Sequence, residues 1–132
     1  MKQLSLDADD ATILAAVRDW VALLVEERYR EAYDYLSHAW GDQWSPQLIE
    51  TVIHNYGSVE PLQDGTTYRV TPLDTATGGP APRHEVDRFD DARGHVWFDL
   101  PLNGQWSDVT ATLYVNRSDD TLVLILDDIH VM

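Results

Sequence analysis

Two aspartates are predicted to face each other across a β-hairpin. Asn103-Gly104 lies between two alternating runs, and this dipeptide favours a two-residue type I′ turn. With that turn, Asp99 is expected directly opposite Asp108. Neighbouring carboxylates can share one proton, which raises one of the two pKa values and creates an acid/base pair. A cation, screening water or a β-bulge between them would account for the pair without catalysis.

The last predicted strand, 122–131, adds a third polar group to this pair in either of two registers. One register places Asp127 beside the two aspartates, and a slip of one residue places Asp128 and His130 there instead. In the second register His130 lies close to Asp108, an arrangement that general base catalysis uses. The candidate catalytic residues are Asp99, Asp108 and His130.

The spacing of the five histidines does not indicate a metal site, because the sequence has no HxH, HxxxH or HExxH pattern. A glycine-rich phosphate loop and a nucleophile elbow are also missing. The chain has no cysteine, which excludes disulfides, thiolate zinc ligands and cysteine nucleophiles. We therefore expect no metal and no cofactor.

A second set of residues has the types expected of a ligand pocket. Trp40 and Trp44 bracket a loop, where they could form a lid over an apolar or cationic ligand or plug the end of a small core. His54 lies next to the apolar face of a predicted helix, where it either lines a pocket or flanks the core. The candidate pocket residues are Tyr33, Trp40, Trp44, His54 and Tyr56.

Large aromatic residues also lie on the hairpin face predicted to point away from the helices. They are Trp97, Trp106 and Tyr114, and they indicate a second buried surface. We expect a homodimer packed sheet to sheet through these three residues. The opposite face, expected under the helices, consists of Val96, Phe98, Leu100, Val109, Ala111 and Leu113.

Three helices are predicted in the first part of the chain. Apolar residues recur at helical spacing over 13–25, after aspartates suited to the N-cap and first turn, and a second stripe runs over 29–38. A break is expected at 26–28. Ser45-Pro46 then opens a third helix, with serine as N-cap and proline in the first turn, and Gly57 ends it.

The second half of the chain has the pattern of strands. An edge strand is predicted over 67–73, because Pro72 cannot donate to a sheet, and a further strand over 84–89. A three-stranded meander follows over 95–131. Helices followed by antiparallel strands predict a single α+β domain over 1–132, with the helices packed on one sheet face.

An N-terminal helix that runs into Glu27-Arg28-Tyr29-Arg30-Glu31-Ala32-Tyr33, followed by a short helix and a long meander, resembles the nuclear transport factor 2-like superfamily. The resemblance covers nearly the whole chain and is one of element order. It implies a cystatin-like cone, α-α-α-β-β-β-β-β, in which a curved sheet wraps around helices and often holds a pocket at its wide end. The superfamily contains isomerases, dehydratases, polyketide cyclases, transport factors and binding modules, so the fold does not choose among them. The segments 106–110 and 126–131 also resemble small bacterial domains, a likeness that implies no activity.

The chain is strongly acidic, with a formal net charge of −14. Nucleic acids and anionic membranes bind clustered cations, so neither is expected as a partner. A basic protein partner fits the charge, and so does an acidic surface that only maintains solubility. A membrane-spanning run and a signal peptide are missing, and we therefore expect a cytoplasmic protein.

Two functions remain open from the sequence. One is a non-catalytic binding module for a small ligand or a protein, in a bacterial immunity or accessory role. The other is an isomerase, dehydratase or cyclase that uses a carboxylate or histidine base in the cone pocket, with Tyr33 or Tyr56 orienting the substrate. The predicted faces place Asp99 and Asp108 outside such a pocket, which favours binding.

Overall fold

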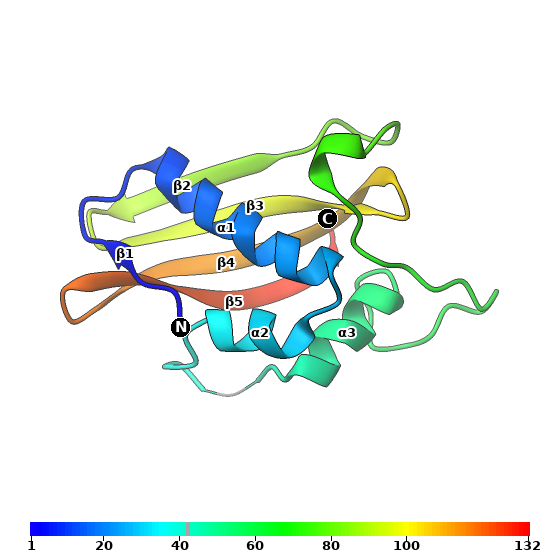
Figure 1. The fold of residues 1–132 in the computed structure, drawn as a ribbon, viewed down its shortest axis with the longest axis horizontal. Coiled ribbons are helices and arrows are strands. Elements are labelled where there is room, and N and C mark those ends of the chain that lie inside the picture. The colour runs from blue at the N-terminus through cyan, green and yellow to red at the C-terminus, as the bar shows by residue number, and fades with distance from the viewer. Residues whose placement is uncertain (42) are drawn as a thin grey trace.

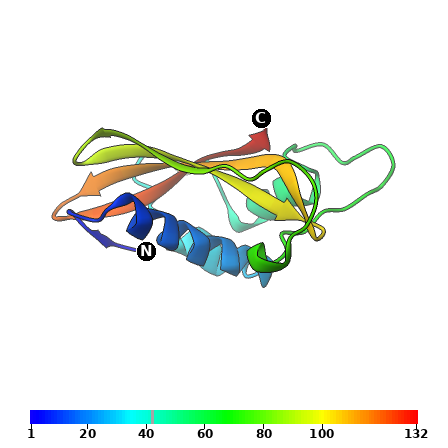
Figure 2. The same cartoon turned by 90° about the horizontal axis from the view of Figure 1, so that it is seen from above.

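The computed structural model describes residues 1–41 and 43–132. Three helices lie on one face of a strongly curled antiparallel sheet with the strand order β1-β5-β4-β3-β2 (Figures 1 and 2). This arrangement confirms the predicted α+β class. The elements are β1 (Leu4–Ser5), α1 (Asp10–Val25), α2 (Tyr29–Tyr35), α3 (Pro46–His54), β2 (His84–Asp90), β3 (Arg93–Leu102), β4 (Gln105–Ser118) and β5 (Thr121–Val131).

The helices begin where the sequence predicts. Asp9 caps α1, its Oδ1 accepting the Thr12 N–H at 2.8 Å. Ser45 caps α3 in the same way, its Oγ accepting the Leu48 N–H at 3.0 Å. Each cap satisfies a backbone donor that the first turn of a helix leaves without a partner. The predicted break after α1 is confirmed by Glu27, whose φ of 57° takes the chain out of the helix.

Two helix ends differ from the prediction. The second helix ends at Tyr35 rather than at His38, because Leu36 adopts an extended conformation with ψ of 158°. The third ends at His54, and Tyr56 leaves the helix with a φ of 57°. Tyr56 therefore lies outside the third helix, which the sequence predicts to extend to Gly57.

The core lies between the helices and the inner face of the sheet. The six hairpin residues predicted for this face have no exposed surface, and they pack with Ile13, Trp20, Ile49 and Ile53 from the helices, which are equally buried. Burying each large apolar side chain contributes about 1.5–3 kcal/mol. The centre of the space between the helices and the sheet is thus filled by the chain's own side chains.

The predicted edge strand over 67–73 is wrong. This segment crosses the tip of the β3–β4 hairpin and makes a single bridge there, between Val70 and Leu102. Pro72 has no N–H to extend the ladder, and the chain turns into one 3-10 turn directly after it. The fifth strand is instead β1, which pairs with the start of β5.

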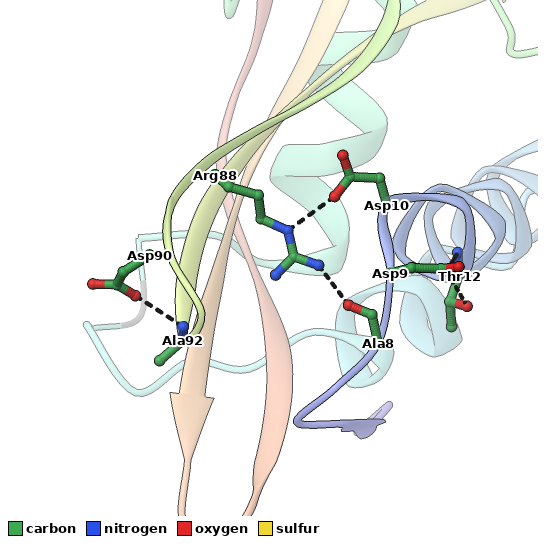
Figure 3. Close-up of polar contacts among 7 residues, drawn as sticks. All are labelled: Ala8, Asp9, Asp10, Thr12, Arg88, Asp90 and Ala92. Atoms are coloured by element: carbon green, nitrogen blue, oxygen red, sulfur yellow. Dashed lines mark hydrogen bonds and ion pairs between the residues drawn. The ribbon is translucent and has the colours of Figure 1, made fainter.

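An arginine ties β2 to the start of α1 (Figure 3). The Arg88 Nε donates to Asp10 Oδ1 at 2.9 Å, and its guanidinium also donates to the Ala8 carbonyl. These bonds hold the edge strand β2 against the helix layer, and the other face of the sheet points away from the helices. We call that face the outer face. Along its middle it carries His95, Trp97, Asp99, Thr110, Thr112, Tyr114, Asp128 and His130.

Candidate functional site

Asp99 lies opposite Thr110 and not opposite Asp108, so the predicted carboxylate pair is wrong. The register agrees with the prediction at the hairpin tip and then shifts, because three residues of β4, 107–109, lie opposite Leu100 alone. Ser107 fits this bulge by donating its hydroxyl to the Leu100 carbonyl at 2.7 Å. A bulge of this kind changes which residues face each other beyond it.

Each of the two aspartates has a structural partner of its own. Asp99 accepts the Thr110 hydroxyl at 2.6 Å and the Arg83 N–H at 2.8 Å. Asp108 accepts the Tyr56 hydroxyl at 2.5 Å. That bond ties the segment after α3 to β4, and it occupies Tyr56, one of the two tyrosines that the enzyme hypothesis offers for orienting a substrate.

The last strand combines both predicted registers. His130 pairs with Thr110 and Asp128 with Thr112, which places both on the outer face. A second bulge after Thr112 keeps Asp127 there as well, because its Oδ2 accepts the Thr112 hydroxyl at 3.0 Å. The His130 Nδ1 lies 3.2 Å from Asp128 Oδ2. Asp99 and Asp108 are therefore held by different partners, and the His130 Nδ1 lies near Asp128 without a hydrogen bond to any described residue.

A buried histidine and Asp127 meet in the middle of the outer face. His95 is only 9% exposed, and its Nε2 lies 3.5 Å from Asp127 Oδ2 without a hydrogen bond to any described residue. The imidazole ring contacts the edge of Trp97, with centroids 4.8 Å apart, and Tyr114, at 4.7 Å. Aromatic packing thus accounts for its burial.

The loop after α2 brings Trp40 and Trp44 to this region. The Ser37 N–H donates to the Leu124 carbonyl at 2.7 Å, so the loop is anchored at the edge of β5. Trp40 packs on Tyr114 with ring centroids 5.1 Å apart and the planes inclined by 58°. A cavity of about 80 Å³ lies between this loop and strands β4 and β5; we call it the loop cavity. Its lining includes Ser37, Trp40, Trp44, Tyr114, Ile125 and Asp127.

The five candidate pocket residues fall into two groups. Trp40 and Trp44 line the loop cavity, and Tyr33 stacks at 3.9 Å on His38, which also lines it. His54 and Tyr56 lie elsewhere. His54 meets the Tyr29 ring edge-on, and Tyr56 packs on Tyr68. Burial, with a smaller contribution from the Asp108 hydrogen bond, raises the pKa of Tyr56 to about 12, so it is a weak acid at neutral pH.

The three candidate interface aromatics are half-buried by their own chain. The Arg83 guanidinium lies over the Trp97 ring at 4.4 Å, and the Trp97 Nε1 donates to Asp87 Oδ2 at 3.2 Å. Trp106 meets His84 edge-on. Tyr114 is covered by Trp40. The structure contains one chain, and the sheet-to-sheet dimer stays a prediction.

A larger cleft of about 540 Å³ lies between the start of α1 and the β2–β3 turn. Its basic group, Arg88, is engaged with Asp10 and the Ala8 carbonyl (Figure 3). Asp90 accepts the Ala92 N–H at 2.8 Å, and this bond lowers the pKa of Asp90. Arg88 and Asp90 in this cleft thus serve the fold, and we take the loop cavity as the candidate site.

The described residues contain no group of three or more His, Cys, Asp or Glu side chains arranged to hold a metal ion. None of the described helices is both long and apolar enough to cross a membrane. Comparison with protein-family models, with curated proteins and with solved structures found no match. The nuclear transport factor 2-like resemblance therefore stays a prediction beyond the shared α+β architecture.

Sequence reasoning did not associate Asp127 and Tyr114 with the two loop tryptophans. One signal was present. Asp127-Asp128 places two consecutive polar residues in an otherwise apolar strand, and a break in alternation is typical of a β-bulge. The contact between Trp40 and Tyr114 had no such signal, because it depends on where the loop crosses the sheet edge.

Proposed function

We propose that this protein is a non-catalytic binding module that holds a basic segment of a protein partner against its outer face. The observation that carries the proposal is the chemistry of that face. It combines half-buried aromatic rings, chiefly Trp97 and Tyr114, with the acidic strip, which we define as Glu85, Asp87, Asp99, Asp127 and Asp128.

The carboxylates of the acidic strip come from β2, β3 and β5, and the strip crosses the intervening strand β4. At about 4.8 Å per strand spacing it is about 14 Å wide, which matches a few residues of an extended peptide. Arg83 lies among these carboxylates and forms an ion pair with Glu85 at 3.1 Å. Asp127 and Asp128 keep side-chain exposures of 41% and 51%, so their charges can be reached by a cationic partner.

The filled core favours binding over catalysis. An enzyme of the isomerase or cyclase type needs titratable groups in a cavity between helices and sheet, and the centre of that space is occupied by Trp20, Phe98 and Leu100, each without exposed surface. A cleft of about 340 Å³ lies at its edge, between α3 and β5. Asp99 is held by the Thr110 hydroxyl and the Arg83 amide. A second copy of the chain is also a poorer occupant than a basic partner, because stacking two outer faces would oppose two acidic strips.

Isothermal titration calorimetry with a short oligolysine peptide at low salt tests the proposal. The variant Asp87→Asn/Asp128→Asn removes two charges from the outer face, and the matched variant Asp119→Asn/Asp120→Asn removes two from the β4–β5 turn. Asparagine keeps an acceptor for the Trp97 indole at position 87. We expect the first variant to weaken binding about fivefold and the second to leave it nearly unchanged.

Equal weakening by both variants would show that the peptide responds to net charge alone, and the outer face would lose its assigned role. Sedimentation velocity on the same samples tests whether a second copy of the chain covers the outer face instead. A dimer that Trp97→Ala/Trp106→Ala converts to a folded monomer would replace the basic partner with a second copy of this chain.

A further inference from the structure

We propose that the loop cavity binds a methylated ammonium group between its aromatic rings and the carboxylate of Asp127. This inference rests on the proposed function, because it specifies which cationic group the protein partner would present.

The walls of the cavity are the first reason. Trp40, Trp44 and Tyr114 line it from a loop and a neighbouring strand. The ring centroids of Trp40 and Tyr114 lie 5.1 Å apart and the ring planes are inclined by 58°, so the two rings are in contact with each other without stacking in parallel. A cation is attracted to the faces of tryptophan and tyrosine within about 6 Å of the ring centroid. Trp40 is 53% exposed, which leaves the cavity accessible from solvent.

The charge of the cavity is the second reason. Asp127 lines it, and among the described residues the ion-pair contact of Asp127 is with His95 alone, at 3.5 Å. The Thr112 hydroxyl donates to the same carboxylate oxygen. Neither contact is made by a lysine or an arginine. A bound ammonium would place its positive charge next to a carboxylate that has no lysine or arginine counter-ion among the described residues.

The size of the cavity and the chemistry of its walls indicate which class of cation it can bind. About 80 Å³ is far below the roughly 300–1,000 Å³ of pockets that enclose a whole drug-sized ligand, so the cavity suits a compact head group. A guanidinium carries five N–H donors that need acceptors, whereas a quaternary ammonium carries none. The indole rings of Trp40 and Trp44 offer a donor but no acceptor. The lining does contain acceptors in Ser37, Gln43 and Asp127, so the small volume and the aromatic walls are what favour a compact methylated ammonium over the longer, planar guanidinium of arginine.

Choline chloride is the first probe, with tryptophan fluorescence and calorimetry as the readouts. Its matched control is the uncharged carbon analogue, in which a tert-butyl group replaces the trimethylammonium group. The two have the same shape, so any difference in affinity reports the charge. We expect choline to bind about fivefold more tightly or better. Equal affinity for both molecules would overturn the proposal, because a merely apolar cavity predicts that result.

Variants then locate the site. Trp40→Ala and Asp127→Asn should each weaken choline binding at least about threefold, and Trp40→Phe should restore part of the loss. The amide introduced by Asp127→Asn can still accept the Thr112 hydroxyl, which preserves that bond. The controls are Phe89→Ala, which removes a 60% exposed ring outside the cavity, and Asp120→Asn in a turn. Equal losses in Trp40→Ala and Phe89→Ala would contradict the assignment.

A peptide carrying trimethyllysine, compared with the same peptide carrying lysine, identifies the source of the group. Tighter binding of the methylated peptide supports a partner side chain. Choline binding without that preference supports a free small molecule carrying the same group. The two proposals fail separately: if choline does not bind but oligolysine still distinguishes the outer-face variants, the cavity assignment falls and the proposed function stands.

Discussion

The Thr110 hydroxyl donates to Asp99 Oδ1 at 2.6 Å across the β3–β4 pair, while Asp99 Oδ2 accepts the Arg83 N–H at 2.8 Å. One carboxylate thereby joins three segments: β3, β4 and the chain entering β2. Hydrogen bonds to a charged group are stronger than neutral ones. The Asp99 carboxylate on the outer face thus stabilises the fold by accepting these two hydrogen bonds.

Asp99→Asn is expected to destabilise the protein by about 1–2 kcal/mol, because the amide has one acceptor oxygen in place of two and loses the charge. Two carboxylates in direct opposition would have given the contrary result, a gain on neutralisation. Urea denaturation followed by circular dichroism measures the free energy of unfolding. Asp120→Asn, in the β4–β5 turn, is the control for the loss of one charge and should change stability little. An unchanged or increased stability of Asp99→Asn would contradict this role.

Buried Tyr29 and half-buried Tyr35 are expected to respond differently to loss of the hydroxyl. The Tyr35 hydroxyl donates to the Ala16 carbonyl at 2.7 Å, whereas the Tyr29 hydroxyl is buried without a hydrogen-bond partner among the described residues. Tyr35→Phe should cost about 1 kcal/mol, and Tyr29→Phe should be neutral or stabilising, since it removes an unsatisfied polar group. Thermal unfolding of the two variants compares them directly. Equal losses would indicate that Tyr29 has a partner, such as a buried water molecule.

Alkaline pH is expected to weaken the fold. Burial raises the pKa of Tyr29, Tyr35 and Tyr56 from 10.0 to about 12. The unfolded chain therefore loses these protons first, and it binds fewer protons than the folded chain between these two values. Stability that is fully present below pH 10 should fall as the pH rises toward about 12. Denaturant titrations across this range, together with tyrosinate absorbance, follow both changes.

The Tyr56→Phe variant measures how much Tyr56 alone contributes to the loss of stability at alkaline pH. It removes one of the three groups with a raised pKa, so its stability should decline less steeply above pH 10 than that of the parent protein. The variant also loses the bond to Asp108, which should lower its stability at neutral pH by about 1 kcal/mol. A decline as steep as that of the parent would show that other groups control the alkaline transition.

The sequence by itself determined the features that depend on neighbouring residues. Asp9 and Ser45 cap their helices because an N-cap needs only a side-chain acceptor a few residues before the donor. Asn103-Gly104 forms the hairpin tip with φ of 52° and 84°, conformations that this pair adopts at little cost. The buried face of the hairpin follows from strict alternation.

Only the tertiary structure decided which side chains meet. The bulge at Ser107 separates Asp99 from Asp108, and the bulge at Asp127 retains a carboxylate that alternation would have turned away. A bulge depends on packing and hydrogen bonds between two strands, so no single run of residues encodes it. Trp40 reaches Tyr114 only because its loop is anchored at the edge of β5. The loop cavity exists through such long-range contacts, whereas the helices, the hairpin and the acidic charge follow from short-range sequence.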